Sequence, residues 1–254
     1  YWMLRDFRAA NNWALLQAQN MATQTRLPLR VCVTLPMQKE DQSERMRTFQ
    51  VEGLREVERD LRGLGIPVHL VSYDGTADET ASRVVEFCRA HQAACVVCDF
   101  HPLRLPRTAV TAVAAALDAE SPAVPLQETD ARNVVPCWHA YPKQAYGAMV
   151  LRRRIMPLLR TFLTRIPRPH KASKADRIVA NPSETRATWD ADLTAVLAAA
   201  RPGVAPVAGM TGGPAAGSQA IEEFLRDRLP RFATHRNNPL VKGQSGLSPW
   251  LHHG

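Results

Sequence analysis

The amino-acid sequence predicts an α/β fold: a five-stranded parallel Rossmann-like sheet with flanking helices, followed by a long connector and one further helix. In the first half of the chain, short apolar runs rich in β-branched residues alternate with longer stretches of helical periodicity. This alternation is typical of right-handed βαβ crossovers and hence of a parallel sheet. Beyond Asp130 the alternation stops and Pro, Ser and Gly become frequent, which indicates a different architecture there.

Four continuous apolar runs are the main strand candidates, because strands of a parallel sheet are covered on both faces. They span residues 29–36, 67–74, 94–100 and 123–130, and the opening Tyr-Trp-Met-Leu is expected to be the end of a first strand. Polar residues then follow the strands at the carboxyl edge of the sheet, where open α/β sheets bind ligands. These residues are Arg5, Asp6, Asp74, Asp99 and His101. No Gly-x-Gly-x-x-Gly follows a strand, so a dinucleotide site in this half is disfavoured.

The helices expected between these strands span residues 11–22, 44–65, 78–91 and 108–119. The longest of them repeats apolar residues at helical spacing, from Met46 and Phe49 through Leu54 and Val57 to Leu61. It stops at a Gly, a common signal at the C-terminal end of a helix. The first 130 residues are therefore predicted to form one complete α/β domain.

Residues 131–216 are predicted to be a basic helix and an interdomain connector. Pro157 lies inside the helical pattern and predicts a kink or break there, and a short Ala-rich helix is expected at residues 191–200. Ser218 can cap the next amphipathic helix, at residues 219–232. We place the start of a second domain at Gly217. The part of it within residues 217–254, one helix and one loop, cannot bury a core of its own.

The chain carries 32 basic and 24 acidic residues, a net charge of +8 that favours a polyanionic partner such as nucleic acid. The excess is concentrated between Arg152 and Arg177, where nine Lys or Arg residues face one Asp. Two interpretations stay open for this segment: a solvated helix face with a linker, or a specific phosphate site. No helix-turn-helix, zinc-finger or basic-zipper signature is present, so a sequence-specific DNA binder has only the net charge in its favour.

The odd number of cysteines, five, fits a reducing compartment better than a disulfide framework. Cys95 and Cys98 have the spacing of a redox or zinc pair, but they lie in an expected buried strand and no second Cys or His pair accompanies them. Core packing is favoured, and no metal site is expected. The sequence predicts neither a membrane span nor a signal peptide. We therefore expect a cytoplasmic protein, or a nuclear one in a eukaryote.

Five blocks, in order, resemble class II cyclobutane pyrimidine dimer photolyases: YWMLRDFRAANNWALLQAQNMA, CDFHPLRLPR, NVVPCWHAYPKQAYGA, FLRDRLPRFATHRNNP and SGLSPWLHHG. The resemblance implies an antenna-binding α/β domain, a connector and the start of an all-α FAD-binding domain. It implies light-dependent repair of UV-damaged DNA, in which excited reduced FAD passes an electron to a pyrimidine dimer flipped out of the duplex. An antenna chromophore, a deazaflavin or a folate, is a further cofactor of the family.

The resemblance also implies roles for individual residues. The family's loop around the FAD diphosphate and ribityl chain reads Ser-Asn-Leu-Ser-Pro, and this chain has Ser245, Gly246, Leu247 and Ser248 before Pro249, with Gln244 contributing a backbone group. Phe232 stands where the family commonly has a Tyr that contacts the flavin phosphates, so the ring is kept and the hydroxyl is lost. Arg236 matches an Arg implicated in holding the damaged DNA strand. No catalytic residue is assigned.

Two other functions compete with dimer repair. A cryptochrome-like blue-light receptor would share the fold and the FAD, and a stand-alone α/β nucleotide-binding or interaction module would use the tail as a spacer. The unpartnered amphipathic helix and Ser-rich loop favour an N-terminal fragment of a photolyase over the module. We expect such a fragment to be a monomer, to be inactive alone and to hold FAD weakly.

Overall fold

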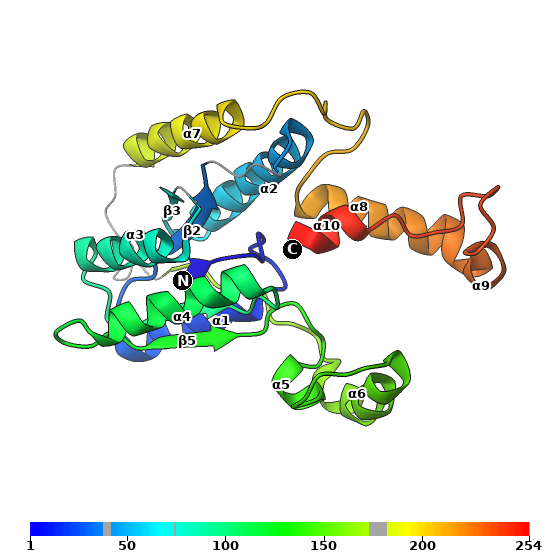
Figure 1. Ribbon diagram of the computed structural model, residues 1–254, viewed down its shortest axis with the longest axis horizontal. Coiled ribbons are helices and arrows are strands. Elements are labelled where there is room, and N and C mark those ends of the chain that lie inside the picture. The colour runs from blue at the N-terminus through cyan, green and yellow to red at the C-terminus, as the bar shows by residue number, and fades with distance from the viewer. Residues whose placement is uncertain (38–41, 74, 173–181, 254) are drawn as a thin grey trace.

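The computed structural model describes residues 1–37, 42–73, 75–172 and 182–253. A five-stranded, all-parallel sheet forms its centre, in the order β3-β2-β1-β4-β5 (Figure 1). The strands are β1 (Trp2–Met3), β2 (Val31–Pro36), β3 (Val68–Tyr73), β4 (Val96–Asp99) and β5 (Leu126–Thr129). The predicted fold class is confirmed. Asp74, predicted at a strand end, lies outside the described residues.

Helices α1 (Trp13–Thr25) and α2 (Glu44–Gly63) pack on one face of the sheet, and α3 (Ala77–Ala90) and α4 (Arg104–Asp118) on the other. Each face has its own apolar core. Local signals place two of the helix starts: the side chain of Asn12 accepts a hydrogen bond from the backbone N–H of Leu15 at 3.0 Å, and Thr76 does the same for Glu79 at 3.1 Å.

Helix α7 (Pro182–Ala198) stands where a short Ala-rich helix was predicted within residues 131–216. The helix begins well before the expected residues 191–200, and three of its side chains enter the core beside α1 and α2. Trp189, Leu193 and Val196 are 2%, 0% and 0% exposed. Their spacing of four and three residues marks one helix face. The residues around Trp189 are mostly polar, so the sequence pattern did not predict this buried helix face.

Helices α5 (Cys137–Ala140) and α6 (Ala148–Phe162) project together from the sheet domain (Figure 1). The prediction of a break at Pro157 is wrong, because α6 runs through it. A proline inside a helix leaves the carbonyl four residues earlier without its usual donor. Here that carbonyl belongs to Arg153, which is exposed together with Pro157, so water can supply the hydrogen bond.

The C-terminal elements are α8 (Pro214–Glu223), a π turn (Phe224–Arg228), a 3-10 turn (Leu229–Arg231), α9 (Phe232–His235) and α10 (Ser248–His253). The prediction that Ser218 caps α8 is wrong. The helix begins at Pro214, whose fixed φ suits a first turn, directly after Gly213. That glycine has φ +109°, and a Cβ there would lie 2.5 Å from the carboxylate of Glu56. Ser218 therefore lies inside the helix.

In the described part of the chain, no helix is long and apolar enough to cross a membrane, and no group of His, Cys, Asp or Glu side chains could hold a metal ion. Cys98 is buried in β4, and Cys95 is half-buried just before it. Burial raises the pKa of the Cys98 thiol, as expected for a core cysteine.

Candidate functional site

The carboxyl edge of the sheet between β1 and β4 is occupied by the protein's own carboxylate. Asp99 accepts hydrogen bonds from the backbone N–H groups of Leu4, Arg5 and Asp6, at 2.7, 2.6 and 2.9 Å, and one from the hydroxyl of Tyr1 at 3.2 Å. Burial, reinforced by the charge of Asp6, raises the pKa of Asp99 to about 6 against the opposing effect of these hydrogen bonds. Asp99 thus fixes the loop after β1.

Arg132 connects this loop to helix α10. Its guanidinium lies 2.8 Å from the carboxylate of Asp6, a fully buried side chain, and Nε donates to the same oxygen at 3.0 Å. On its other side, Nη1 of Arg132 donates to the carbonyl of Leu251 and, at 3.1 Å, to that of His252. The backbone N–H of Phe7 donates to the carbonyl of His253 at 3.1 Å. The last three carbonyls of α10 are therefore held by the sheet domain.

Aromatic packing completes the attachment of α10. The ring of Phe49, on α2, lies 5.8 Å from the ring of Trp250 and 5.7 Å from that of His253. The indole N–H of Trp250 donates to the carbonyl of Thr211 at 3.0 Å, and a Cβ on Gly217 would come within 3.1 Å of the indole. This close approach explains why a glycine stands at that point of α8.

His253 is held in its neutral form. Burial lowers the pKa of its imidazole to about 4, and the nearby charges of His252, Arg132 and Arg5 act in the same direction. A protonated ring at this position would face two guanidinium groups. The contact between α10 and the sheet domain therefore depends on an uncharged His253.

The residues predicted to surround the FAD diphosphate form an open loop in front of α10. The backbone N–H groups of Ser245, Gly246, Leu247 and Ser248 make no hydrogen bond within the described part of the chain. Gly246 has φ +69° and open space where a Cβ would stand, so it can present its N–H without steric cost. Unpaired N–H donors and two hydroxyls fit a diphosphate, because they offer hydrogen bonds to its negative oxygens.

The other predicted site residues join this loop through a chain of contacts. The ring of Phe232 packs edge-on against Phe224 at 5.5 Å, and the guanidinium of Arg236 lies over the Phe232 ring at 5.7 Å. Gln244 donates from its side-chain amide to the carbonyl of Arg236 at 3.4 Å, and Arg228 donates to that of Ser245 at 3.4 Å. The structure thus brings Phe232, Arg236, Gln244 and Ser245 together, with Arg236 exposed to solvent.

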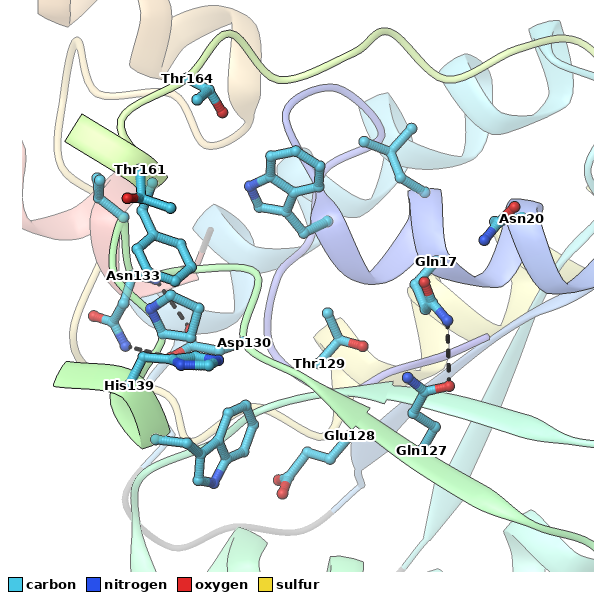
Figure 2. Close-up of a pocket in the computed structure, with 16 residues that line it drawn as sticks. Gln17, Asn20, Gln127, Glu128, Thr129, Asp130, Asn133, His139, Thr161 and Thr164 are labelled. Atoms are coloured by element: carbon cyan, nitrogen blue, oxygen red, sulfur yellow. Dashed lines mark hydrogen bonds between the residues drawn. The ribbon is translucent and has the colours of Figure 1, made fainter. Parts of the chain in front are cut away.

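Two cavities adjoin these elements. One of about 420 Å³ lies between the sheet domain, the end of α6, α8 and α10, and is lined by Phe162, Thr164, Ile221, Leu247 and Trp250 among others. The second, of about 640 Å³, lies beside the edge strand β5 (Figure 2). Trp13, Trp138 and Phe162 form its aromatic walls, and the side chains of Gln17 and Gln127 hydrogen-bond at 3.3 Å on its rim.

The cavity beside β5 has a rigid floor. The carboxylate of Asp130 accepts from the backbone N–H groups of Arg132, Asn133 and Cys137 at 3.2, 3.0 and 2.9 Å. It also accepts from the side chain of Asn133 at 2.9 Å (Figure 2). Asp130 therefore shapes the turn from β5 into α5. The sequence analysis uses Asp130 only as the end of the α/β domain. Its position directly after a strand is the signal that could have marked it as a structural residue of this turn.

These features define an α/β sheet protein with a helical C-terminal segment, in which a loop with unpaired N–H groups leads into a helix docked on the sheet domain. The chain belongs to the DNA photolyase family, whose family model matches residues 1–172. Deoxyribodipyrimidine photo-lyase of Potorous tridactylus is 36% identical over 257 residues, covering 100% of this chain and 45% of the relative. The Arabidopsis thaliana enzyme of the same name is 34% identical over 261 residues, covering 100% and 50%. The chain thus spans about half the length of the curated relatives it matches.

Solved structures agree on the fold. The archaeal photolyase of Sulfolobus tokodaii, whose structure contains two FAD molecules and implies a novel light-harvesting cofactor, matches with a TM-score of 0.63 at 14% identity, covering 100% of this chain and 51% of that one. The Synechocystis sp. PCC6803 cryptochrome matches with a TM-score of 0.68 at 12% identity, covering 98% and 51%. Both support the sheet architecture alone, because the identities are low.

Proposed function

We propose that this chain supplies the α/β domain and the FAD phosphate loop of a light-dependent DNA-repair enzyme that splits cyclobutane pyrimidine dimers. The observation that carries the proposal is that two proteins named deoxyribodipyrimidine photo-lyase align with all of this chain at 36% and 34% identity. Repair is therefore favoured over a cryptochrome-like receptor.

The loop formed by Gln244 to Ser248 would hold the diphosphate of FAD. Its unpaired N–H groups and the hydroxyls of Ser245 and Ser248 are the donors. Gly246 replaces the Asn of the family pattern, so a backbone contact is kept and a side-chain contact is lost. When bound and reduced, FAD would supply the electron that a photoexcited flavin donates to the dimer.

Arg236 would hold the damaged DNA strand. Its guanidinium is exposed, and the Phe232 ring beneath it at 5.7 Å restricts its orientation. A guanidinium can pair bidentately with a phosphate and can also stack on an unstacked base. Both interactions are useful beside a pyrimidine dimer that has left the duplex.

The chain by itself is expected to be inactive and to bind FAD weakly. The described loop would contact only the phosphate part of the cofactor, and its side chains are exposed or half-exposed. An open site of this kind gives up much of the binding energy of a closed pocket. We further expect a monomer that acts on DNA inside the cell.

An antenna chromophore, a deazaflavin or a folate, is a second cofactor that we propose for the α/β domain. The cavity beside β5 is the candidate, because aromatic walls and amide groups suit a planar, hydrogen-bonding ring. Binding of either chromophore should quench the tryptophan fluorescence of the chain, and Trp138→Ala should weaken that binding. Equal affinity in the variant would remove the cavity from consideration.

The FAD loop is tested in a chimera in which residues 1–254 replace the matching part of the Potorous relative. We expect the purified chimera to carry stoichiometric FAD. Phe232→Tyr, which restores the family's hydroxyl, should slow FAD loss on dilution, and Ser245→Ala with Ser248→Ala should accelerate it. An unchanged rate of FAD loss in both variants would show that the loop does not contact the phosphates.

A further inference from the structure

A row of seven exposed cations follows α6 and the extended segment after it. We call this row the cationic track, and it consists of Arg152, Arg153, Arg154, Arg160, Arg165, Arg168 and Lys171. The sequence contains no Asp or Glu between Asp130 and Asp176. The track therefore has no acidic neighbour along the chain that could neutralise it.

Among the described residues, the track also lacks acidic partners in space. In the part of the chain that the structure describes, none of its seven side chains forms a salt bridge, and Arg154 rests over the ring of Tyr141 at 5.8 Å. On α2 and α3, by contrast, some exposed arginines are paired: Arg62 with Glu58 at 3.4 Å, and Arg89 with Glu120 at 2.6 Å. Like charges placed this close repel one another. Such a row is stabilised by a polyanionic counterpart.

The segment that carries the track is held at two places. Near its middle, where α6 ends, the ring of Phe162 lies 5.3 Å from that of His139 on α5. At its far end, Gln19 donates to the carbonyl of His170 at 2.7 Å and accepts from its N–H at 3.3 Å. The N–H of Ala172 donates to the carbonyl of Leu64 at 2.8 Å. A backbone segment that is already held in place loses less conformational entropy when it binds.

We propose that the cationic track binds the phosphodiester backbone of duplex DNA, as a surface additional to Arg236. The choice of DNA as the polyanion rests on the proposed function. The position of the track supports the proposal. Phe162 and Thr164 line the same cavity of about 420 Å³ as Leu247 and Trp250, so the track passes beside the proposed FAD loop. Helix α6 and helices α8 to α10 also project from the same side of the sheet domain (Figure 1).

The test measures binding of the purified 254-residue chain to an undamaged, fluorescein-labelled duplex by fluorescence anisotropy at several KCl concentrations. The variant is Arg153→Gln with Arg160→Gln and Arg168→Gln. If each arginine neutralises one phosphate, the slope of log K against log[KCl] should decrease in magnitude by about 2 to 3, and the Kd should rise at least about tenfold at 0.1 M KCl. No cofactor and no light are needed.

The matched control is Arg59→Gln with Arg62→Gln and Arg83→Gln, which removes the same charge from α2 and α3. We expect it to keep the Kd within about twofold of the parent chain, and we expect the melting temperatures of both variants to match that of the parent. An equal loss of affinity in the control and the track variant would overturn the proposal, because only net charge would then matter.

Two further outcomes would overturn it: no duplex binding by the parent chain at low salt, or binding to vesicles of phosphatidylcholine with phosphatidylserine in place of the duplex. Failure of this proposal is distinguishable from failure of the proposed function. A chain that binds undamaged duplex through the track, while the chimera leaves dimers intact in light, would support the track and refute repair. If the chimera repairs dimers but the track variant binds the duplex as well as the parent chain does, repair would be supported and the track refuted.

Discussion

At the residue scale, Arg132 is the side chain that joins the sheet domain to the FAD loop. It lies between the buried carboxylate of Asp6 and the C-terminal carbonyls of α10, with 17% of its side chain exposed. A cation at the C-terminal end of a helix also interacts favourably with the helix dipole. The loop ends where α10 begins, so the contacts of Arg132 with α10 help to determine where that loop stands relative to the sheet.

Arg132→Gln should destabilise the protein by about 2 to 3 kcal/mol, because it leaves the buried charge of Asp6 with only Arg8 as a partner. The measurement is urea unfolding followed by tryptophan fluorescence. Arg107→Gln is the matched control, since it breaks an ion pair to Glu128 whose arginine is 41% exposed; its cost should stay under about 1 kcal/mol. Equal costs for the two variants would mean that Arg132 has no special structural role.

His253 makes the attachment of α10 sensitive to pH. The fold lowers its pKa from the ordinary 6.5 to about 4, so the unfolded chain takes up the proton first as the pH falls. Its stabilising contribution is complete above pH 6.5 and is lost between pH 6.5 and about 4. The melting temperature of the parent should therefore fall more between pH 7 and pH 5 than that of His253→Gln.

Asp99 acts in the opposite direction, because its raised pKa of about 6 lets the folded state bind a proton that the unfolded chain binds only at lower pH. The effect of Asp99 is common to the parent and to His253→Gln, so the difference between the two reports on His253. His235→Gln, on the short helix α9, serves as a control and should keep the parent's pH dependence. Parallel pH curves for the parent and His253→Gln would contradict this role.

At the scale of elements, α7 belongs to the core of the sheet domain. Leu193 is fully buried among residues from α1, α2 and the sheet. Leu193→Ala should cost about 2 to 5 kcal/mol, because it removes buried methyl groups and leaves a cavity. The control is Leu225→Ala, at a side chain that is 50% exposed, and it should cost far less. Urea unfolding that shows no loss for Leu193→Ala would mean that α7 is detached from the core in solution.

The elements also show what could be predicted from sequence. The strands and helices of residues 1–130 could be predicted, because apolar runs and helical spacing are local signals. Two features could not be predicted: the N-terminal start of α7 and the continuity of α6 through Pro157. Both depend on the surroundings of each helix. The assignment of residues 244–248 to the FAD diphosphate rests on a resemblance to a family pattern and stays a prediction. Arg132 and His253 could not be predicted, because their partners lie more than a hundred residues away along the chain.

At the scale of the whole molecule, the structure links three regions that are distant in sequence. The loop after β1, the turn into α5 and the C-terminal α10 meet at Asp6, Arg132 and His253. The segment that carries the cationic track borders the cavity at this meeting point through Phe162 and Thr164, and Arg236 lies over Phe232 on α9. The arrangement supports a protein that holds a flavin phosphate at one loop while DNA lies against the same side.

The most direct test of this account measures dimer splitting by the chimera of residues 1–254 with the remaining part of the Potorous relative. UV-irradiated DNA is incubated with the FAD-loaded chimera, and cyclobutane dimers are counted after blue light and after darkness. We predict loss of dimers in light and none in the dark, with slower loss in Arg236→Ala at equal FAD content. A folded chimera with stoichiometric FAD that leaves the dimers intact in light would contradict the account.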